Sequence, residues 1–375
     1  MPETNAIPRV DGLETALDAR LNSITSPKYR QDTKTVINNF AVFLVDERGQ
    51  DVDALEDITV TDCRRWVQYL RDNSKNDLSA ASMHTYYAIA RSTIGWFVRD
   101  RRLDTNPMDA ASVEEELPHD DGNTNTQFWD DDARDELLAF VDERAHDALE
   151  REDADAAKPF RERALVYLLA DTGVRGAEIL SVSGDNRRNG IRWADVDLDA
   201  GVLDVLGKSG DIEPVSMPGP TVAKLDRYYR LVEPPAEWPV IPTGHAPSKF
   251  RAVRDELIDE RGRDADVIED LLAEKDVDVV LREEEVAPPA LTTEGARTVL
   301  KRLCDAAGVD VDGEYLKPHG GRRALGDALY RESPTTAQDA LRHQSIETTH
   351  ESYRDVGTEQ LAEDIETIRY NEESE

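Results

Sequence analysis

Residues 341–353, LRHQSIETTHESY, decide the fold when they are considered together with three shorter segments that precede them. In this stretch His343 comes directly before the serine- and threonine-rich start of a helix, and Tyr353 follows ten residues later. Serine and threonine favour helix N-termini because their side chains accept hydrogen bonds from unpaired backbone N–H groups. Taken alone, a tyrosine at such a place is more often a core residue than a functional one.

Two of the earlier segments each contribute one basic residue. In TGVRGAEIL, residues 172–180, Arg175 follows a helix-ending glycine and opens the next helix, where its guanidinium can reach an anion beside the helix N-terminus. In GKSG, residues 207–210, Lys208 lies in a turn between two predicted strands. The alternatives are a surface ion pair with Glu178 for the arginine and a solvated turn for the lysine.

The remaining segment is HGGR, residues 319–322, which follows a Lys-Pro pair and starts a helix. His319 and Arg322 stand three residues apart, so both lie on one helical face and can contact the same phosphate; an incidental histidine is the alternative. The order of all the segments is more informative than any one of them. Arginine, hairpin lysine, His-x-x-Arg, histidine and tyrosine, in this order, resemble the tyrosine recombinase (phage integrase) family over nearly the whole chain.

The resemblance implies a set of six catalytic residues. They are Arg175, Lys208, His319, Arg322, His343 and Tyr353. The two arginines would bind the non-bridging oxygens of a scissile phosphate, because a planar guanidinium matches phosphate with two hydrogen bonds. Tyr353 would attack the phosphorus and form a 3′-phosphotyrosyl bond, Lys208 would protonate the departing 5′-oxygen, and the histidines would position the phosphate and assist proton transfer. No metal or other cofactor is implied, since two arginines can neutralise the phosphate charge.

Some positions depart from the family pattern. Gly320-Gly321 stand before the second arginine, where the family often has a larger apolar residue, and Arg323 follows where another histidine is common. Tyr353 follows His343 by ten residues, whereas nine is the usual spacing in the family. We expect Glu178 to brace the fold, and His350 to pack beside the tyrosine.

Apolar residues at helical spacing predict four N-terminal helices, near residues 11–23, 28–48, 59–73 and 79–102. This region resembles the core-binding domain of the family. Basic residues on these helices are candidates for DNA contacts: Lys28, Arg30, Lys34, Arg64, Arg65 and Arg91. The sequence therefore predicts a helical N-terminal DNA-binding domain over residues 11–110.

An acidic, polar stretch follows and predicts a linker over residues 111–126, before a catalytic domain over residues 127–375. Within that domain we expect helices at residues 127–181, 245–285, 292–307 and 321–366, and short antiparallel strands at 191–197, 202–206 and 213–217. The predicted fold class is mainly α with a small antiparallel β-sheet (α+β). The charged helical stretch at residues 245–285 receives no chemical role.

The net charge of −34 is unusual for a protein that binds DNA, because DNA affinity depends on basic groups. Residues 1–110, however, are close to neutral, with 14 basic and 17 acidic side chains. We interpret the acidity elsewhere as a halophilic adaptation to a salty cytoplasm, where roughly 1 M salt screens charges within about 3 Å. DNA binding would then depend more on shape and direct base contacts.

Location and thiol chemistry follow from simple features. The longest apolar runs reach about a third of the roughly 20 residues that a bilayer requires, and the N-terminus lacks the pattern of a signal peptide. These features predict a cytoplasmic protein without membrane association. Cys63 and Cys304 are expected to be free, partly buried thiols.

The sequence thus predicts a recombinase that acts on double-stranded DNA as a homotetramer and is a monomer when free. Residues 361–370 are amphipathic and are expected to dock on a neighbouring protomer. A catalytically inactive DNA-binding regulator of the same fold is an alternative, although such a protein has no reason to keep all six catalytic groups. A type IB topoisomerase-like nicking-closing enzyme is another, but the two-domain size and the late tyrosine favour a recombinase.

Overall fold

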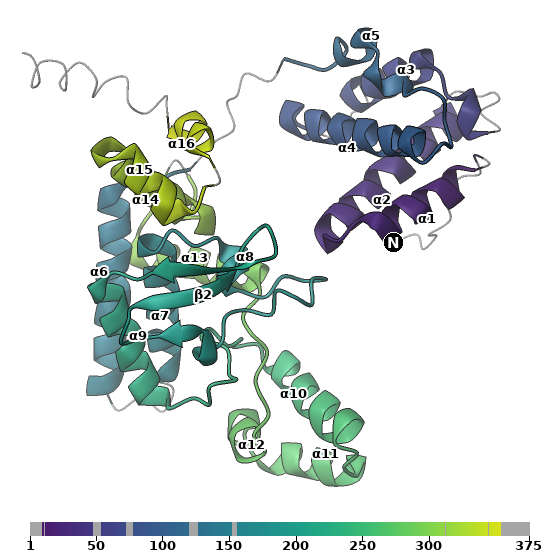
Figure 1. The fold of residues 1–375 in the computed structure, drawn as a ribbon. Helices are drawn as coiled ribbons and strands as arrows, with labels where there is room; N and C mark the ends of the chain where they lie inside the picture. Colours follow the sequence, from purple (N-terminus) through teal and green to yellow (C-terminus); the bar gives the residue numbers. More distant parts are fainter. Residues whose placement is uncertain are drawn as a thin grey trace, which may run out of the picture. The chain divides into compact units, whose positions relative to one another are not determined.

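The computed structural model describes residue 10 and residues 12–47, 54–72, 78–119, 127–151, 156–311, 313–343 and 345–353. The chain divides into two compact units, Met1–Asn125 and Thr126–Glu375 (Figure 1). Across the ranges given above, no helix combines the length and the apolar composition that crossing a membrane requires. The predicted docking segment at residues 361–370 lies outside the described residues.

The first unit is helical, as predicted. Its elements are α1 (Leu13–Ser23), α2 (Pro27–Val42), the π-helical η1 (Phe43–Glu47), η2 (Leu55–Asp57), α3 (Val60–Asp72), α4 (Ala80–Arg99), η3 (Pro107–Asp109) and α5 (Ala111–Glu114). Ser26 and Ser79 accept hydrogen bonds from backbone N–H groups at the starts of α2 and α4, so both predicted helix starts are confirmed. Phe40, Trp66 and Phe97 are fully buried at the centre of this unit.

Packing extends the first unit beyond its predicted end at residue 110. Val113, in α5, is fully buried in the same core, and Leu117 packs against it. Because these apolar side chains gain from removal from water, residues 111–117 are part of the packed unit and not of a free linker. The predicted linker residues 120–126 lie outside the described ranges.

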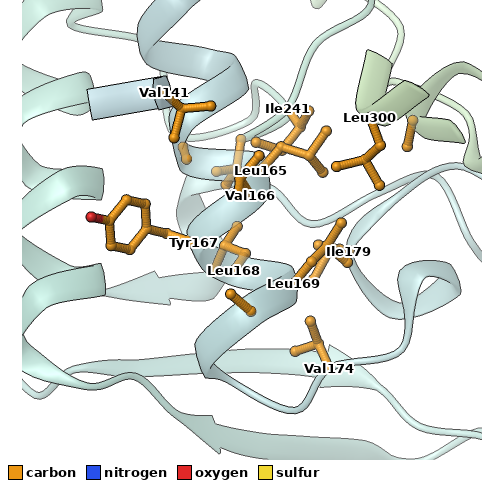
Figure 2. Packing of buried hydrophobic residues seen from close by; sticks show 14 of the residues in the cluster. Val141, Leu165, Val166, Tyr167, Leu168, Leu169, Val174, Ile179, Ile241 and Leu300 are labelled. Atoms are coloured by element: carbon orange, nitrogen blue, oxygen red, sulfur yellow. The ribbon is translucent and has the colours of Figure 1, made fainter. Parts of the chain in front are cut away.

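The second unit is built around α7 (Ala157–Asp171), which is buried from Glu162 to Ala170. A helix that is apolar on all sides is stable only when other elements surround it. Figure 2 shows Leu165, Val166, Leu168 and Leu169 of α7 among side chains from several segments, with the Tyr167 hydroxyl pointing away. The helices that pack most closely on α7 are α6 (Asp131–Glu150), α9 (Gly219–Val232) and α14 (Pro318–Glu332). The other helices of the main body are α8 (Gly176–Ile179), α13 (Thr293–Ala307), α15 (Pro334–Leu341) and α16 (Ile346–Tyr353), of which α15 and α16 pack on α14.

The sheet of the second unit contains β1 (Val196–Asp197), β2 (Val202–Leu206) and β3 (Ile212–Ser216), paired antiparallel in this order. The first predicted strand, residues 191–197, was too long. Residues Trp193–Asp195 form a 3₁₀ turn, η4, because the Asp195 carboxylate accepts a hydrogen bond from the Arg192 N–H and Trp193 is buried beside Tyr228. Only the last two residues of the prediction are in the strand.

The charged stretch near residues 245–285 forms a separate lobe of the second unit (Figure 1). It contains α10 (Ala246–Arg254), the π-helical η5 (Asp255–Glu260), α11 (Ala265–Glu274) and α12 (Val277–Glu283). Val253, Leu257, Ile268 and Val280 are fully buried in a core of its own. The stretch is therefore helical, as predicted, and packs largely on itself.

Both cysteines are free thiols, as predicted, and they are buried more completely than expected. Cys63 and Cys304 are each 0% exposed. Burial raises the pKa of the Cys63 thiol to about 12, so this thiol stays protonated. Both cysteines act as small apolar core residues.

Candidate active site

Arg175 stands at the turn between α7 and α8. Gly173 adopts a left-handed backbone conformation, with φ 65°, which ends α7. The Arg175 backbone N–H and guanidinium donate hydrogen bonds to the two carboxylate oxygens of Glu178, at 2.7 and 2.8 Å. Burial opposes ionisation of Glu178, but the backbone N–H of Arg175 and the charge of Arg342 outweigh it and lower the pKa of Glu178. Glu178 therefore braces this turn as a carboxylate.

Arg322 lies in α14 and is 3% exposed. Its guanidinium donates hydrogen bonds to the backbone carbonyls of Gly173 and Leu341, so it connects the Arg175 turn to the end of α15. Desolvation, followed by the nearby charge of Arg175, lowers the pKa of Arg322 to about 10. Arg322 remains a cation at neutral pH, and in the described part of the chain backbone carbonyls, not a direct ion pair, hold its position.

The two glycines before Arg322 are explained by packing. A Cβ atom on Gly321 would overlap the backbone carbonyl of Leu169 in α7, and one on Gly320 would lie 2.5 Å from Cδ1 of the Trp129 ring. The Trp129 indole N–H also donates a hydrogen bond to the Lys317 carbonyl, at 2.7 Å. The departure from the family pattern therefore lets α14 approach α7 and Trp129 closely.

His343 and Tyr353 come from the segment after α15. The Nδ1 atom of His343 lies 2.9 Å from the hydroxyl oxygen of Thr349, which fixes the ring orientation. Tyr353 is 3% exposed, and its phenol lies against α14 so closely that a Cβ atom on Gly326 would overlap the hydroxyl oxygen. Burial raises the pKa of the Tyr353 phenol, against the opposing charges of Arg322 and Arg323.

His350 and Tyr353 both contact the ring of Tyr330. The His350 Nδ1 atom and the Tyr330 hydroxyl are 2.5 Å apart, and the centroids of the Tyr330 and Tyr353 rings are 5.9 Å apart. Tyr330 thus supports the ring of Tyr353 and is itself held by His350.

These groups meet at one cavity of about 380 Å³. It is lined by Phe128, Arg175, His319, Arg322, Arg323, His343 and Tyr353. Among these lining residues, all of them in the described part of the chain, three are arginines and none is acidic. In a chain with a net charge of −34, such a surface is suited to an anion.

Both histidines of the cavity are held neutral. Desolvation of the His319 ring at the cavity wall, together with the charges of Arg323 and Arg322, lowers its pKa to about 4, although the residue as a whole remains exposed. Desolvation and the charges of Arg322 and Arg175 lower the pKa of His343 to about 4 as well. At neutral pH each ring can therefore accept a proton or a hydrogen bond. Within the described ranges, no cluster of histidine, cysteine and carboxylate side chains is arranged to hold a metal ion.

Five of the six predicted catalytic residues thus line the cavity, and Lys208 does not. It lies in the exposed turn between β2 and β3. Sequence reasoning noted Arg323 only as a departure from the family pattern, whereas the structure places it in the cavity wall. Its position directly after Arg322, in the second turn of α14, was the available signal.

The basic residues predicted to contact DNA lie on α2, α3 and α4, and four of them have partners within the unit. Lys28 pairs with Asp32 at 2.6 Å, and the Arg30 guanidinium donates to the Ile24 carbonyl. Arg64 pairs with Glu116, and Arg91 pairs with Asp109, each at 2.7 Å. The other two, Lys34 and Arg65, have no partner among the described residues.

The sequence matches the family model described as "Phage integrase family" over residues 139–360, which is more than half of the chain. The chain belongs to this family. The match begins in α6 and includes all six predicted catalytic positions.

Curated relatives of this integrase-family chain are tyrosine recombinases. It is 24% identical to tyrosine recombinase XerC of Xanthomonas campestris pv. campestris (strain B100) over 217 residues, which cover 57% of this chain and 55% of that protein. It is also 24% identical to XerC of Xylella fastidiosa (strain 9a5c) over 242 residues, covering 58% of this chain and 72% of that protein. The chain thus spans about half the length of the first relative.

Solved structures of integrases have a similar fold. The Tn1549 transposon integrase in complex with circular intermediate DNA aligns with a TM-score of 0.54, at 13% identity, over 91% of this chain and 94% of that one. A lambda integrase (75–356) dimer bound to a COC′ core site aligns with a TM-score of 0.55, at 14% identity, over 92% and 96% of the two chains. At these identities the likeness establishes the fold.

Proposed function

We propose that this integrase-family protein is a site-specific recombinase that cleaves and rejoins double-stranded DNA through a phosphotyrosyl bond at Tyr353. One observation carries the proposal. Five side chains from segments far apart in the sequence line a single cavity rich in arginine, and one of them is a phenol. A phosphodiester is the anion that requires this combination of charge and nucleophile.

The cavity residues divide the chemistry among them. Arg175 and Arg322 bind the two non-bridging oxygens of the phosphate and stabilise the charge of the transition state. The Tyr353 oxygen attacks the phosphorus, and a neutral histidine of the cavity accepts its proton. The bond from phosphorus to the 5′-oxygen breaks, and Lys208 donates a proton to that oxygen. The reverse reaction rejoins DNA without ATP, since the phosphotyrosine conserves the bond.

The free chain requires two rearrangements before this reaction. Lys208 lies outside the cavity wall, so the exposed tip of the β2–β3 turn has to bring its ammonium group to the phosphate when DNA binds. Tyr353 is buried against Gly326, and a shift of its ring has to accompany the entry of the phosphate. A phosphate in the cavity would also offset the charges of Arg322 and Arg175, which together with the larger effect of desolvation hold the pKa of His343 low.

The rest of the proposal follows the sequence predictions. The N-terminal unit binds DNA through its basic helices, four protomers act on two duplexes, and the high acidity adapts the protein to concentrated salt. No cofactor takes part. Of the N-terminal candidates, Lys34 and Arg65 have no partner among the described residues to give up when they bind phosphate, so we expect them to contribute most.

A nicked suicide DNA substrate tests the proposal, because the small product diffuses away and traps the covalent adduct. Wild-type protein and the matched control Tyr330→Phe should form the adduct, whereas Tyr353→Phe should bind the DNA and form none. Adducts that persist with Tyr353→Phe would show that another residue is the nucleophile. Binding without any wild-type adduct would favour the inactive regulator, and site-independent relaxation of supercoiled plasmid would favour the topoisomerase.

A further inference from the structure

Arg342, the residue directly before His343, has an unusual backbone. It ends α15 in the left-handed conformation, with φ 53°. Glycine is the usual residue at such a position, because a Cβ atom makes this conformation unfavourable. An arginine here indicates that its side chain makes contacts that offset the backbone strain.

Those contacts are two ion pairs with carboxylates from different elements. The Arg342 Nε atom lies 3.0 Å from Oε2 of Glu213 in β3, and Nη2 lies 2.6 Å from Oε2 of Glu178 in α8. The arginine side chain is 11% exposed, and those of Glu178 and Glu213 are 1% and 29% exposed. Charged hydrogen bonds are screened less by water at buried sites, so the pair with Glu178 is the stronger one, and together the two pairs connect the hairpin to the Arg175 turn.

Glu213 lies against Gly207, the residue directly before Lys208. It faces Val205 across the hairpin, and its carboxylate covers Gly207 so closely that a Cβ atom on Gly207 would overlap it. Arg188 holds the same part of the hairpin, since its guanidinium donates to the carbonyls of Leu206 and Gly207 at 2.8 and 2.7 Å. The base of the lysine turn is therefore fixed by two arginines.

The segment 341–343, which contains Arg342, also contacts the residues expected to bind phosphate. The carbonyl of Leu341 accepts a hydrogen bond from Arg322, and His343 lines the cavity. Residues 341–343 thus contact Arg322 through one residue, the hairpin through the next, and the cavity through the third. Neither Arg342 nor Glu213 lines the cavity itself.

We propose that Arg342 and Glu213 are a positioning pair that couples the β2–β3 hairpin to His343 and Arg322, and so sets the place from which Lys208 protonates the leaving oxygen. The inference rests on the proposed recombinase function. Since neither residue reaches the phosphate, the pair acts through Lys208. Loss of the pair should impair protonation of the leaving 5′-oxygen more than stabilisation of the charge on the phosphate.

Two suicide substrates separate these effects. One carries the natural phosphodiester, and the other carries sulfur in place of the bridging 5′-oxygen, so that a thiolate leaves without needing a proton. General acid catalysis typically contributes 10²- to 10⁴-fold, so Lys208→Ala should slow cleavage of the natural substrate by at least about 100-fold. Glu213→Gln and Arg342→Gly should each slow it by roughly tenfold or more, as misplacement of an intact acid retains part of its effect. All three should cleave the sulfur substrate at near the wild-type rate.

Arg322→Lys is the control, because it should be slow on both substrates. Arg342→Gly removes the ion pairs without straining the backbone, and adding Glu213→Gln to it should cause no further loss. Equal losses on both substrates, no loss on either, or additive effects in the double variant would each overturn the positioning role. If the wild-type protein cleaves neither substrate, the proposed function itself fails, which is a different outcome.

Discussion

Gly326 offers a direct test of where the Tyr353 phenol lies. It occupies the interior of α14, where alanine is ordinarily more stable than glycine by roughly 0.5–1 kcal/mol. A Cβ atom at this position would overlap the Tyr353 hydroxyl oxygen and lie 2.5 Å from Cζ of the same ring. Overpacking of this kind costs about 1–3 kcal/mol. Gly326→Ala should therefore lower the free energy of unfolding of the second unit by about 1 kcal/mol.

The measurement is chemical denaturation of wild-type and variant proteins, followed in each unit. Gly95→Ala is the matched control, since its Cβ atom in α4 would have no neighbour closer than 3.4 Å and should gain roughly 0.5–1 kcal/mol in the first unit. In a Tyr353→Ala background, Gly326→Ala should lose most of its cost, because only the flexible end of Leu341 remains close. If Gly326→Ala stabilises the wild-type protein as the control does, the phenol does not lie against α14.

Three further predictions concern charge. Arg322→Lys should slow strand cleavage by about 10²- to 10³-fold in single-turnover assays with little change in DNA affinity. Because the pKa of His343 falls from 6.5 to about 4 on folding, the free energy of unfolding should decrease as pH falls from about 6.5 to about 4. His343→Gln should reduce that decrease by about 1–2 kcal/mol in denaturation at pH 7 and pH 4. Lys34→Gln and Arg65→Gln should each reduce the salt dependence of DNA binding by about one ion, and an unchanged slope would exclude a phosphate contact.

The sequence predicted most helices of both units, because helical periodicity is a local signal, but it missed α9 (Gly219–Val232). It overestimated the first strand and placed the linker too early. The 3₁₀ turn at Trp193–Asp195 and the packing of Val113 depend on partners that are distant in sequence. Local patterns contain no information about such partners.

In the site, too, local motifs could be predicted and contacts between distant segments could not. The resemblance to the integrase family was sufficient to nominate Arg175, Arg322 and Tyr353, which line one cavity. It could not predict that Gly321 is required by the close approach of α14 to α7, or that Arg342 reaches Glu213 across the site. These relations arise only when the packed elements bring separate segments together.

The most direct test of the central claim is to identify the residue that carries DNA. Protein trapped on a suicide substrate would be digested with nuclease and trypsin, and the peptides analysed by tandem mass spectrometry. Cleavage after Arg342 and after Arg354 releases residues 343–354, whose tyrosine is Tyr353. We predict that this peptide carries the nucleotide mass on Tyr353. A nucleotide on Tyr330, on Tyr315 or on a serine would contradict the mechanism.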